Sequence, residues 1–368
     1  MNLIDISNLR LANQQISESK FRTVKDIVGW MGAIQAQDYI MSKWAIGIRL
    51  PGSTESLIES SVNNGEIIRT HLMRPTWHFV SSDDIYWMLD LTAPQILSSL
   101  KFRDKELELT KDIYNRSNYV IENSLRDGNH LSRAMLMAEI VNSGIRVDEN
   151  RGSHLLMKAE LDGIICSGKI IATKPSYALL SERVPLRRKL TRDEQLAELA
   201  RRYFTSHSPA TLQDFTWWSG LSSAEARQAL EIVKPGLTSE TIHNKVYWMT
   251  ISDSAASPNN SIYFLPAYDE FIISYKDRTP SMSVENHRKT ISINGFFRPV
   301  VVINGQIRGI WKRTIKKEKV TLETEFFDYQ EILSNGRMMK AADDFGSFVK
   351  KQIEIPDNQD TRLVKSAI

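Results

Sequence analysis

The feature that most limits what this chain can fold into is a pattern of helices followed by a two-stranded ribbon. The stretch TVKDIVGWMGAI places Val24 and Ile27 on one face of a helix, and Thr23 is a suitable N-cap. STESLIESSVNNGEI predicts a second helix that stops at Asn64-Gly65. IIRTHLMRPTWHFV then predicts two short strands. Helices that precede a ribbon in this order are typical of a winged helix.

The same pattern returns twice. The second copy predicts a helix in NHLSRAMLMAEIVNSG that is capped near Asn129 or Ser132, a helix in RGSHLLMKAELDGIICSGK and a ribbon in IIATKPSYALLSERV. In the third copy, Thr211 opens a short helix, Gly220 ends it and Ser222 caps the next one. A helix, a short turn and a helix can present a recognition helix to DNA. No strict sequence repeat is visible, so three similar units are expected rather than a solenoid.

The composition changes after a polar linker, SDSAASPNNS. The following stretches are rich in predicted strands, Asn304-Gly305 is a strong hairpin signal and Asn294-Gly295 a weaker one. The stretch MMKAADDFGSFVKKQI predicts a final helix. The predicted fold is therefore α+β, with three tandem winged helices and a β-rich C-terminal region that carries a hairpin. The expected boundaries are residues 1–112, 113–190 and 191–255 for the winged helices, 256–355 for the β-rich region and 356–368 for a tail.

Composition excludes several classes of protein. The 368 residues are 42% hydrophobic and 25% charged, which is ordinary for a globular chain. A net charge of +3 means that nucleic-acid binding depends on how charge is distributed. Cys166 is the only cysteine, so neither an intrachain disulfide nor a cysteine-based zinc site is expected. The N-terminus does not resemble a signal peptide, and no apolar run is long enough to span a membrane, so a cytoplasmic protein is expected.

Two amides mark the end of the first predicted helix, in the sequence GAIQAQDY. Glutamine is neither acid nor base, but each amide offers an acceptor and two donors with which to hold a water molecule. Residues two apart on a helix point to different sides. If Gln35 and Gln37 share one water, the helix must end at about Ile34 and the chain must then run extended. The alternative is that both glutamines are solvated surface residues.

Several phrases, taken in order, resemble one family. They are QAQD, RTHLMRPTWH, RRYFTSHSPATLQDFTWWSGLS, FLPAYDEFIISYKDR and VVINGQIRGIWKR, which extend over most of the chain. The sequence resembles the winged-helix DNA-binding family that includes the AlkZ and AlkX DNA glycosylases. This resemblance implies three winged helices bent into a C around duplex DNA, with a β-hairpin in a groove. It also implies excision of alkylated bases, including interstrand crosslinks.

The resemblance also assigns a catalytic motif. The family carries Gln–aliphatic–Gln in AlkZ-type members and Gln–aliphatic–Asp in AlkX-type members. Here the motif reads Gln35-Ala36-Gln37, which is the AlkZ type, and Asp38 lies one place too late to be the AlkX aspartate. An alkylated purine that carries positive charge leaves as a neutral base without a general acid. Two amides that aim one water at the sugar are then sufficient.

The expected protein is thus a monofunctional DNA glycosylase without cofactor or metal, acting on N7-alkylguanine and N3-alkyladenine. Its expected partner is double-stranded DNA, and it is expected to work as a monomer without an obligate protein partner. The rival class is a non-catalytic winged-helix DNA binder or transcriptional regulator, which should dimerise to read half-sites. The residues expected to contact DNA are Arg69, Arg74, His78, Arg187, Arg188, Lys312, Arg313 and Lys316.

Other readings of these residues stay open at the level of sequence. The charges of the first ribbon suit a solvated surface equally well, and those of the linker near Arg187 suit it somewhat better. His71 or His78 could orient the water instead of contacting DNA. Trp217 and Trp218 resemble a stacking platform, but core packing fits them better. The acids Asp214, Asp269 and Glu270 lack the spacing of a metal site.

Overall fold

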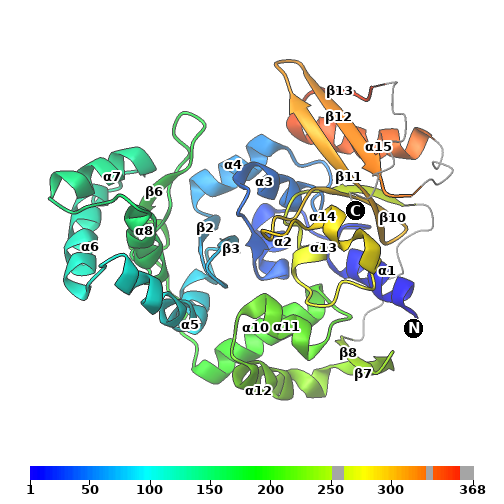
Figure 1. Ribbon diagram of the computed structural model, residues 1–368, viewed down its shortest axis with the longest axis horizontal. Helices are drawn as coiled ribbons and strands as arrows, with labels where there is room; N and C mark the ends of the chain where they lie inside the picture. The colour runs from blue at the N-terminus through cyan, green and yellow to red at the C-terminus, as the bar shows by residue number, and fades with distance from the viewer. Residues whose placement is uncertain (251–260, 329–334, 357–368) are drawn as a thin grey trace.

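The computed structural model describes residues 1–250, 261–328 and 335–356 (Figure 1). The predicted polar linker, 252–261, and the predicted tail, 356–368, lie outside the described residues apart from Ser261 and Pro356. The fold is a mixture of α-helices and small sheets, as the sequence predicts, and only β12 and β13 pair in parallel within the described residues. Within the described residues, no helix combines the length and apolar character needed to cross a membrane.

Three successive segments share one order of elements: a helix, a short strand, two helices and two strands. In the first two segments the short strand pairs with the last strand, which gives the sheet orders β1-β3-β2 and β4-β6-β5. In the third, a single bridge between Ala210 and Trp248 takes the place of the short strand. The first segment comprises α2 (Val24–Met31), β1 (Ile34–Gln35), α3 (Tyr39–Gly47), α4 (Glu55–Asn64), β2 (Ile67–His71) and β3 (Trp77–Ser81). The second comprises α6 (Lys111–Leu125), β4 (Leu131–Ser132), α7 (Arg133–Asn142), α8 (Arg151–Leu161), β5 (Ile165–Ser167) and β6 (Ser176–Leu179). The third comprises α10 (Arg192–Ser206), α11 (Leu212–Ser219), α12 (Ser223–Val233), β7 (Thr238–Ile242) and β8 (Lys245–Met249).

Side-chain caps fix where most of these helices begin. Thr23, Thr54 and Ser132 each accept a hydrogen bond from a backbone N–H in the first turn of the helix that follows. Thr211 and Ser222 go further and form capping boxes with the acid three positions later. These starts agree with the sequence prediction, because a cap is a local signal that the sequence shows directly.

Other elements of the N-terminal two thirds were not expected. The helix α3 was missed, and β5 lies a few residues before the predicted start of the second ribbon at Ile170. The long helix α5 joins the first two segments and includes Pro94. The remaining elements of this region are α1 (Leu3–Asn13), α5 (Ile85–Glu106), α9 (Leu180–Arg183) and the 3₁₀ turn η1 (Lys234–Gly236).

The C-terminal region is built on a five-stranded sheet of order β13-β12-β11-β10-β9. The Asn304-Gly305 turn joins β10 and β11 with both residues at positive φ, as the hairpin signal predicts. At Asn294-Gly295 there is only an isolated bridge between Ile291 and Phe297. The elements are β9 (Ile262–Leu265), α13 (Glu270–Ile273), the 3₁₀ turn η2 (Val284–Asn286), α14 (His287–Thr290), β10 (Val300–Ile303), β11 (Gln306–Ile315), β12 (Lys319–Phe326), α15 (Asn335–Val349) and β13 (Gln352–Glu354).

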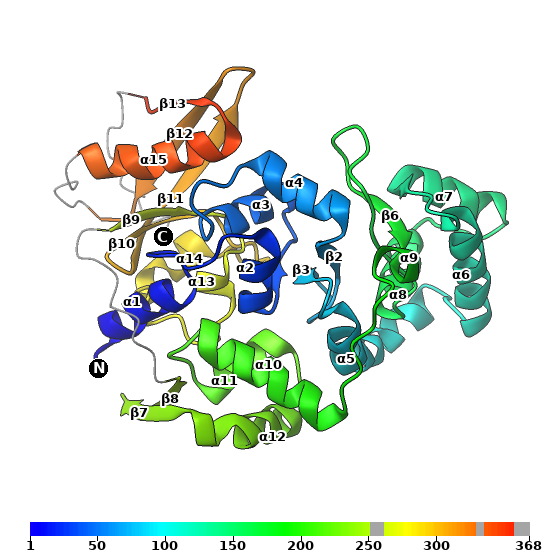
Figure 2. The same ribbon diagram turned by 180° about the vertical axis from the view of Figure 1, so that it is seen from behind.

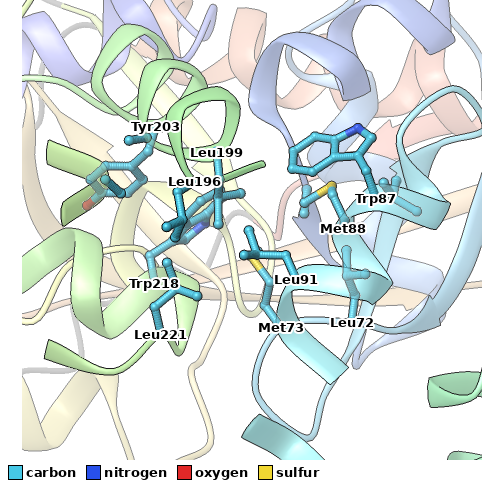
Figure 3. Packing of buried hydrophobic residues seen from close by; sticks show 14 of the residues in the cluster. Leu72, Met73, Trp87, Met88, Leu91, Leu196, Leu199, Tyr203, Trp218 and Leu221 are labelled. Carbon is cyan, nitrogen blue, oxygen red and sulfur yellow. The ribbon is translucent and has the colours of Figure 1, made fainter. Parts of the chain in front are cut away.

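A shared core fixes the third segment against the first (Figure 3). Leu196, Leu199 and Trp218 from α10 and α11 belong to the same buried cluster as Leu72 and Met73, which follow β2. A second core joins the first segment to the C-terminal sheet and α15. The second segment has a core of its own and lies at one end of the molecule (Figures 1 and 2). The turn between β2 and β3 therefore packs against the third segment through Leu72 and Met73.

The shared core should respond strongly to a cavity. Leu199 is fully buried, so Leu199→Ala should lower the free energy of unfolding by about 2–5 kcal/mol. Leu186 is 84% exposed, and the same substitution there should change it by less than about 0.5 kcal/mol. Urea unfolding followed by tryptophan fluorescence measures both variants. Equal effects at the two positions would contradict the assignment of this core.

Candidate active site

Gln35 lies in a short strand, and Gln37 follows it two residues later. The helix α2 ends at Met31, three residues before the predicted Ile34, because Gly32 takes a positive φ of 75° and caps it. The chain then enters β1, where Gln35 lies opposite His78 of β3 and the N–H of Ala36 donates to Trp77 O at 2.7 Å. The strand ends at Gln35, and Gln37 lies in the bend between β1 and α3.

The two amides differ in exposure. Gln37 is exposed, whereas Gln35 is 4% exposed. The Oε1 of Gln35 accepts a hydrogen bond of 3.4 Å from the guanidinium of Arg74. Its backbone N–H donates to Oε1 of Glu270 at 2.6 Å. The site therefore combines one amide that is fixed from two directions with one that faces solvent.

Asp38 ends the glutamine stretch and starts the next helix. Its carboxylate accepts the N–H groups of Ile40 and Met41 at 3.1 and 3.0 Å, which makes it the N-cap of α3. An acid in this role satisfies free backbone donors and complements the helix dipole. Its hydrogen bonds explain why an aspartate follows directly after the two glutamines.

Arg69 supports the same strand from its other side. Its guanidinium donates twice to the carbonyl of Ala36, at 3.0 and 2.9 Å, and lies 4.5 Å from the centre of the Trp77 ring. Beyond it, a cavity of about 760 Å³ separates the first ribbon from the second segment. The residues that line this cavity include Arg69, Trp77, Arg133, Lys174 and Tyr177. Its wall thus combines cations with aromatic rings.

The histidine beside Gln35 is not a surface residue. His78 is fully buried and its Nδ1 lies 3.0 Å from the carbonyl of Thr76, which requires Nδ1 to be the protonated nitrogen. Burial and the nearby charge of Arg74 lower the pKa of His78 to about 3. A buried neutral imidazole cannot reach a phosphate. The prediction that His78 contacts DNA is therefore corrected.

Arg74 is also turned inward. Its guanidinium contacts Gln35 and lies 5.7 Å from the centre of the Trp217 ring, and burial lowers its pKa. Lys276 and Arg278 approach the same ring at 4.8 and 5.6 Å. Trp218, in contrast, is fully buried, as expected for a core residue.

A buried carboxylate completes the site, and the sequence does not assign it this place. Glu270, the first residue of α13, accepts hydrogen bonds at Oε2 from Trp218 Nε1 at 3.2 Å and from the hydroxyl of Ser274. The same oxygen lies 3.7 Å from Nε2 of His207. Burial alone would raise the pKa of Glu270, but the nearby His207 and the hydroxyl of Ser274 lower it to about 2.

The two predicted basic clusters differ in how far they are already paired. Arg187 makes two hydrogen bonds of 2.8 Å to Asp90, and Arg188 lies 4.0 Å from Glu198. In the second cluster, Lys312 and Lys316 are exposed on the β11–β12 hairpin. Arg313 contacts Met41 on α3, and Asp38 opposes the lowering of its pKa by burial. The end of β11 therefore lies close to Asp38 and α3.

With the fold and site described, the family can be stated. A family model described as DNA glycosylase AlkZ-like matches residues 28–342. The chain therefore belongs to the family of AlkZ-like DNA glycosylases, as its sequence predicts, and is an enzyme of that class.

A relative and a solved structure, both from one organism, are similar to this chain. An interstrand DNA cross-link repair glycosylase of Streptomyces sahachiroi is 20% identical over 321 residues, which cover 82% of this chain and 85% of that protein. The solved structure of the DNA glycosylase AlkZ from the same organism has a TM-score of 0.79 at 20% identity. That match covers 97% of this chain and all of the solved one, so the two share a fold.

The neutral His78 should make folding sensitive to acid. Its pKa is about 3 in the folded protein against 6.5 ordinarily, so the unfolded chain binds more protons between these values. Stability present above pH 6.5 should be lost as the pH falls toward 3, at up to about 1.4 kcal/mol per pH unit. His78→Gln should reduce this slope, measured by urea unfolding at several pH values. His243→Gln, at an exposed position, is the control and should not. An unchanged slope in His78→Gln would show that His78 is protonated in the folded state.

Proposed function

We propose that this chain is a monofunctional, cofactor-free DNA glycosylase that hydrolyses the N-glycosidic bond of cationic alkylated purines. The observation that carries the proposal is the pair of amides two residues apart at the end of β1, one held in place and one exposed. The proposed substrates are N7-alkylguanine and N3-alkyladenine. Interstrand crosslinks are included, because the relative from Streptomyces sahachiroi is named for their repair.

The chemistry requires little from the protein beyond placement. Alkylation at N7 or N3 puts positive charge on the base, so the base leaves as a neutral molecule and needs no general acid. The sugar passes through an oxocarbenium-like state, and a water molecule must attack its C1′. In the proposed mechanism, Gln35 and Gln37 hold that water between their amides. No proton donor or strong base is needed at the moment of cleavage.

The charges around the glutamines suit this role. His78 stays neutral. Arg74 and Glu270 have opposite charges, and they contact the side chain and the backbone of Gln35, respectively. Neither His78, with a pKa of about 3, nor Glu270, with a pKa of about 2, titrates close to neutral pH. The rate of excision should therefore vary little between roughly pH 6 and 8 once DNA is saturating.

The proposed DNA-binding architecture is a C-shaped arrangement of three winged helices, bounded at residues 1–112, 113–190 and 191–255 and followed by the β-rich region 256–355. The repeated element order of the three segments supports it. Lys312, Arg313 and Lys316 are proposed to contact phosphates, because they lie near the turn of the β11–β12 hairpin, close to Asp38. Duplex DNA would be bound by a monomer, without an obligate protein partner.

A panel of lesions tests the proposed reaction. Oligonucleotides that each carry one lesion are incubated with the protein, and abasic sites are then cleaved and counted on a gel. N7-methylguanine and N3-methyladenine should be released. Uracil and hypoxanthine should not, because their neutral forms would have to leave as anions or be protonated first. Release of uracil without release of N7-methylguanine would refute the two-amide mechanism. Sequence-specific binding without any release would favour a transcriptional regulator.

Single substitutions test the two amides. Gln35→Ala and Gln37→Ala should each slow single-turnover excision about 10- to 1,000-fold, the range for one positioned polar group. Gln37→Asp should stay active, because a carboxylate can also hold the water. Gln213, which is exposed on α11, provides the control, and Gln213→Ala should match the wild type. A wild-type rate in either catalytic variant would exclude that residue from the reaction.

A further inference from the structure

The backbone of Gln35 has an unusual partner. In the order β1-β3-β2, β1 is an edge strand, and its neighbour β3 accepts the N–H of Ala36. Successive N–H groups of a strand point to opposite sides, so the N–H of Gln35 points away from β3. A buried backbone donor at an edge needs another acceptor. Glu270 supplies it from a residue 235 positions away.

We propose that Glu270 is a positioning residue for the excision reaction: its buried carboxylate fixes the backbone of Gln35 and balances the charge of Arg74 behind it. The inference rests on the proposed function, since the reaction it serves is the release of a cationic base. Neither the amides nor the family match assigns this role. It follows from the contacts of Glu270 with the glutamine strand and with the α10–α11 core.

The first step is the hold on the strand. Glu270 is fully buried, and its second oxygen is fixed by Trp218 and Ser274. Trp218 belongs to the large shared core, so the carboxylate cannot move far. The N–H of Gln35 donates a hydrogen bond of 2.6 Å to this anchored group, and that bond sets the position of Gln35. A charged acceptor makes this bond stronger than a backbone carbonyl would.

The second step concerns charge. Arg74 donates to the side chain of Gln35, so a guanidinium lies beside the amide that faces the reaction. Without a counter-charge, that cation would repel both the cationic base and the developing oxocarbenium ion. Glu270 contacts the backbone of the same residue and opposes the effect of burial on Arg74. Both neighbouring histidines have lowered pKa values owing to burial and are neutral, so they do not add positive charge.

Two substitutions separate reach from charge. Glu270→Gln keeps an oxygen within reach of Gln35 but removes the charge, whereas Glu270→Asp keeps the charge but shortens the side chain. Each should lower the single-turnover rate on N7-methylguanine DNA by about 10- to 100-fold, with DNA affinity unchanged. Asp214→Asn is the matched control: Asp214 is equally buried and accepts several backbone N–H groups, but it does not contact the glutamine strand.

A second measurement does not depend on activity. Hydrogen–deuterium exchange of the peptide that contains Gln35 should be roughly 10-fold faster in Glu270→Gln and unchanged in Asp214→Asn. Thermal midpoints identify variants that fail to fold. If Glu270→Gln is one of them, Ser274→Ala, which removes one donor to Glu270, should still speed exchange and slow excision.

The outcomes separate this inference from the proposed function. Loss of rate and protection in the Glu270 variants alone supports the positioning role. Equal rates and equal exchange in folded Glu270→Gln and Asp214→Asn would overturn it, even if the wild type excises N7-methylguanine. A wild type that releases no cationic base would refute the proposed function, and the exchange experiment would still decide whether Glu270 fixes the strand.

Discussion

Two adjacent buried carboxylates at the start of α13 connect the N-terminal and C-terminal parts of the molecule by hydrogen bonds. Asp269 accepts two hydrogen bonds of 2.8 Å from Arg49, which also contacts Gln14. Glu270 accepts the N–H of Gln35. Because all of these groups are buried, loss of either carboxylate would leave a desolvated donor or charge without its partner. The position of the glutamine strand depends on this link to the C-terminal region.

Local signals account for the parts of the fold that could be predicted. Caps such as Thr23 and Thr211, and the turn at Asn304-Gly305, act within a few residues, so they are visible in the sequence. The helix α3 has buried side chains nearly all round and therefore lacks an amphipathic pattern. The strand β1 has only two residues, too few for a period to appear. The helix α3 was therefore missed, and β1 was predicted only as an extended stretch, from the two glutamines.

The sequence could predict which residue types the candidate site needs, but it could not predict which of these residues are buried. The end of α2 and the extended path through Gln35 follow from the need for two amides to share one water. His78 was assigned to DNA because a sequence shows that a residue is polar but not that it is enclosed. Glu270 was considered only as a metal ligand, since its partner Gln35 is distant in sequence. Long-range contacts of single side chains leave no periodic signal.

The arrangement suggests why such a site suits damaged rather than normal bases. In the structure, the buried groups Arg74 and Glu270 each contact Gln35, and the charge of Glu270 opposes the effect of burial on Arg74. The exposed Gln37 is neutral and lies at the surface. A site of this kind stabilises a leaving base only weakly, so it acts when the lesion itself supplies the positive charge. On the proposed mechanism, the two amides act only on one water and the sugar. A bulky adduct on the base therefore need not enter the site, which would allow attack on a crosslinked base.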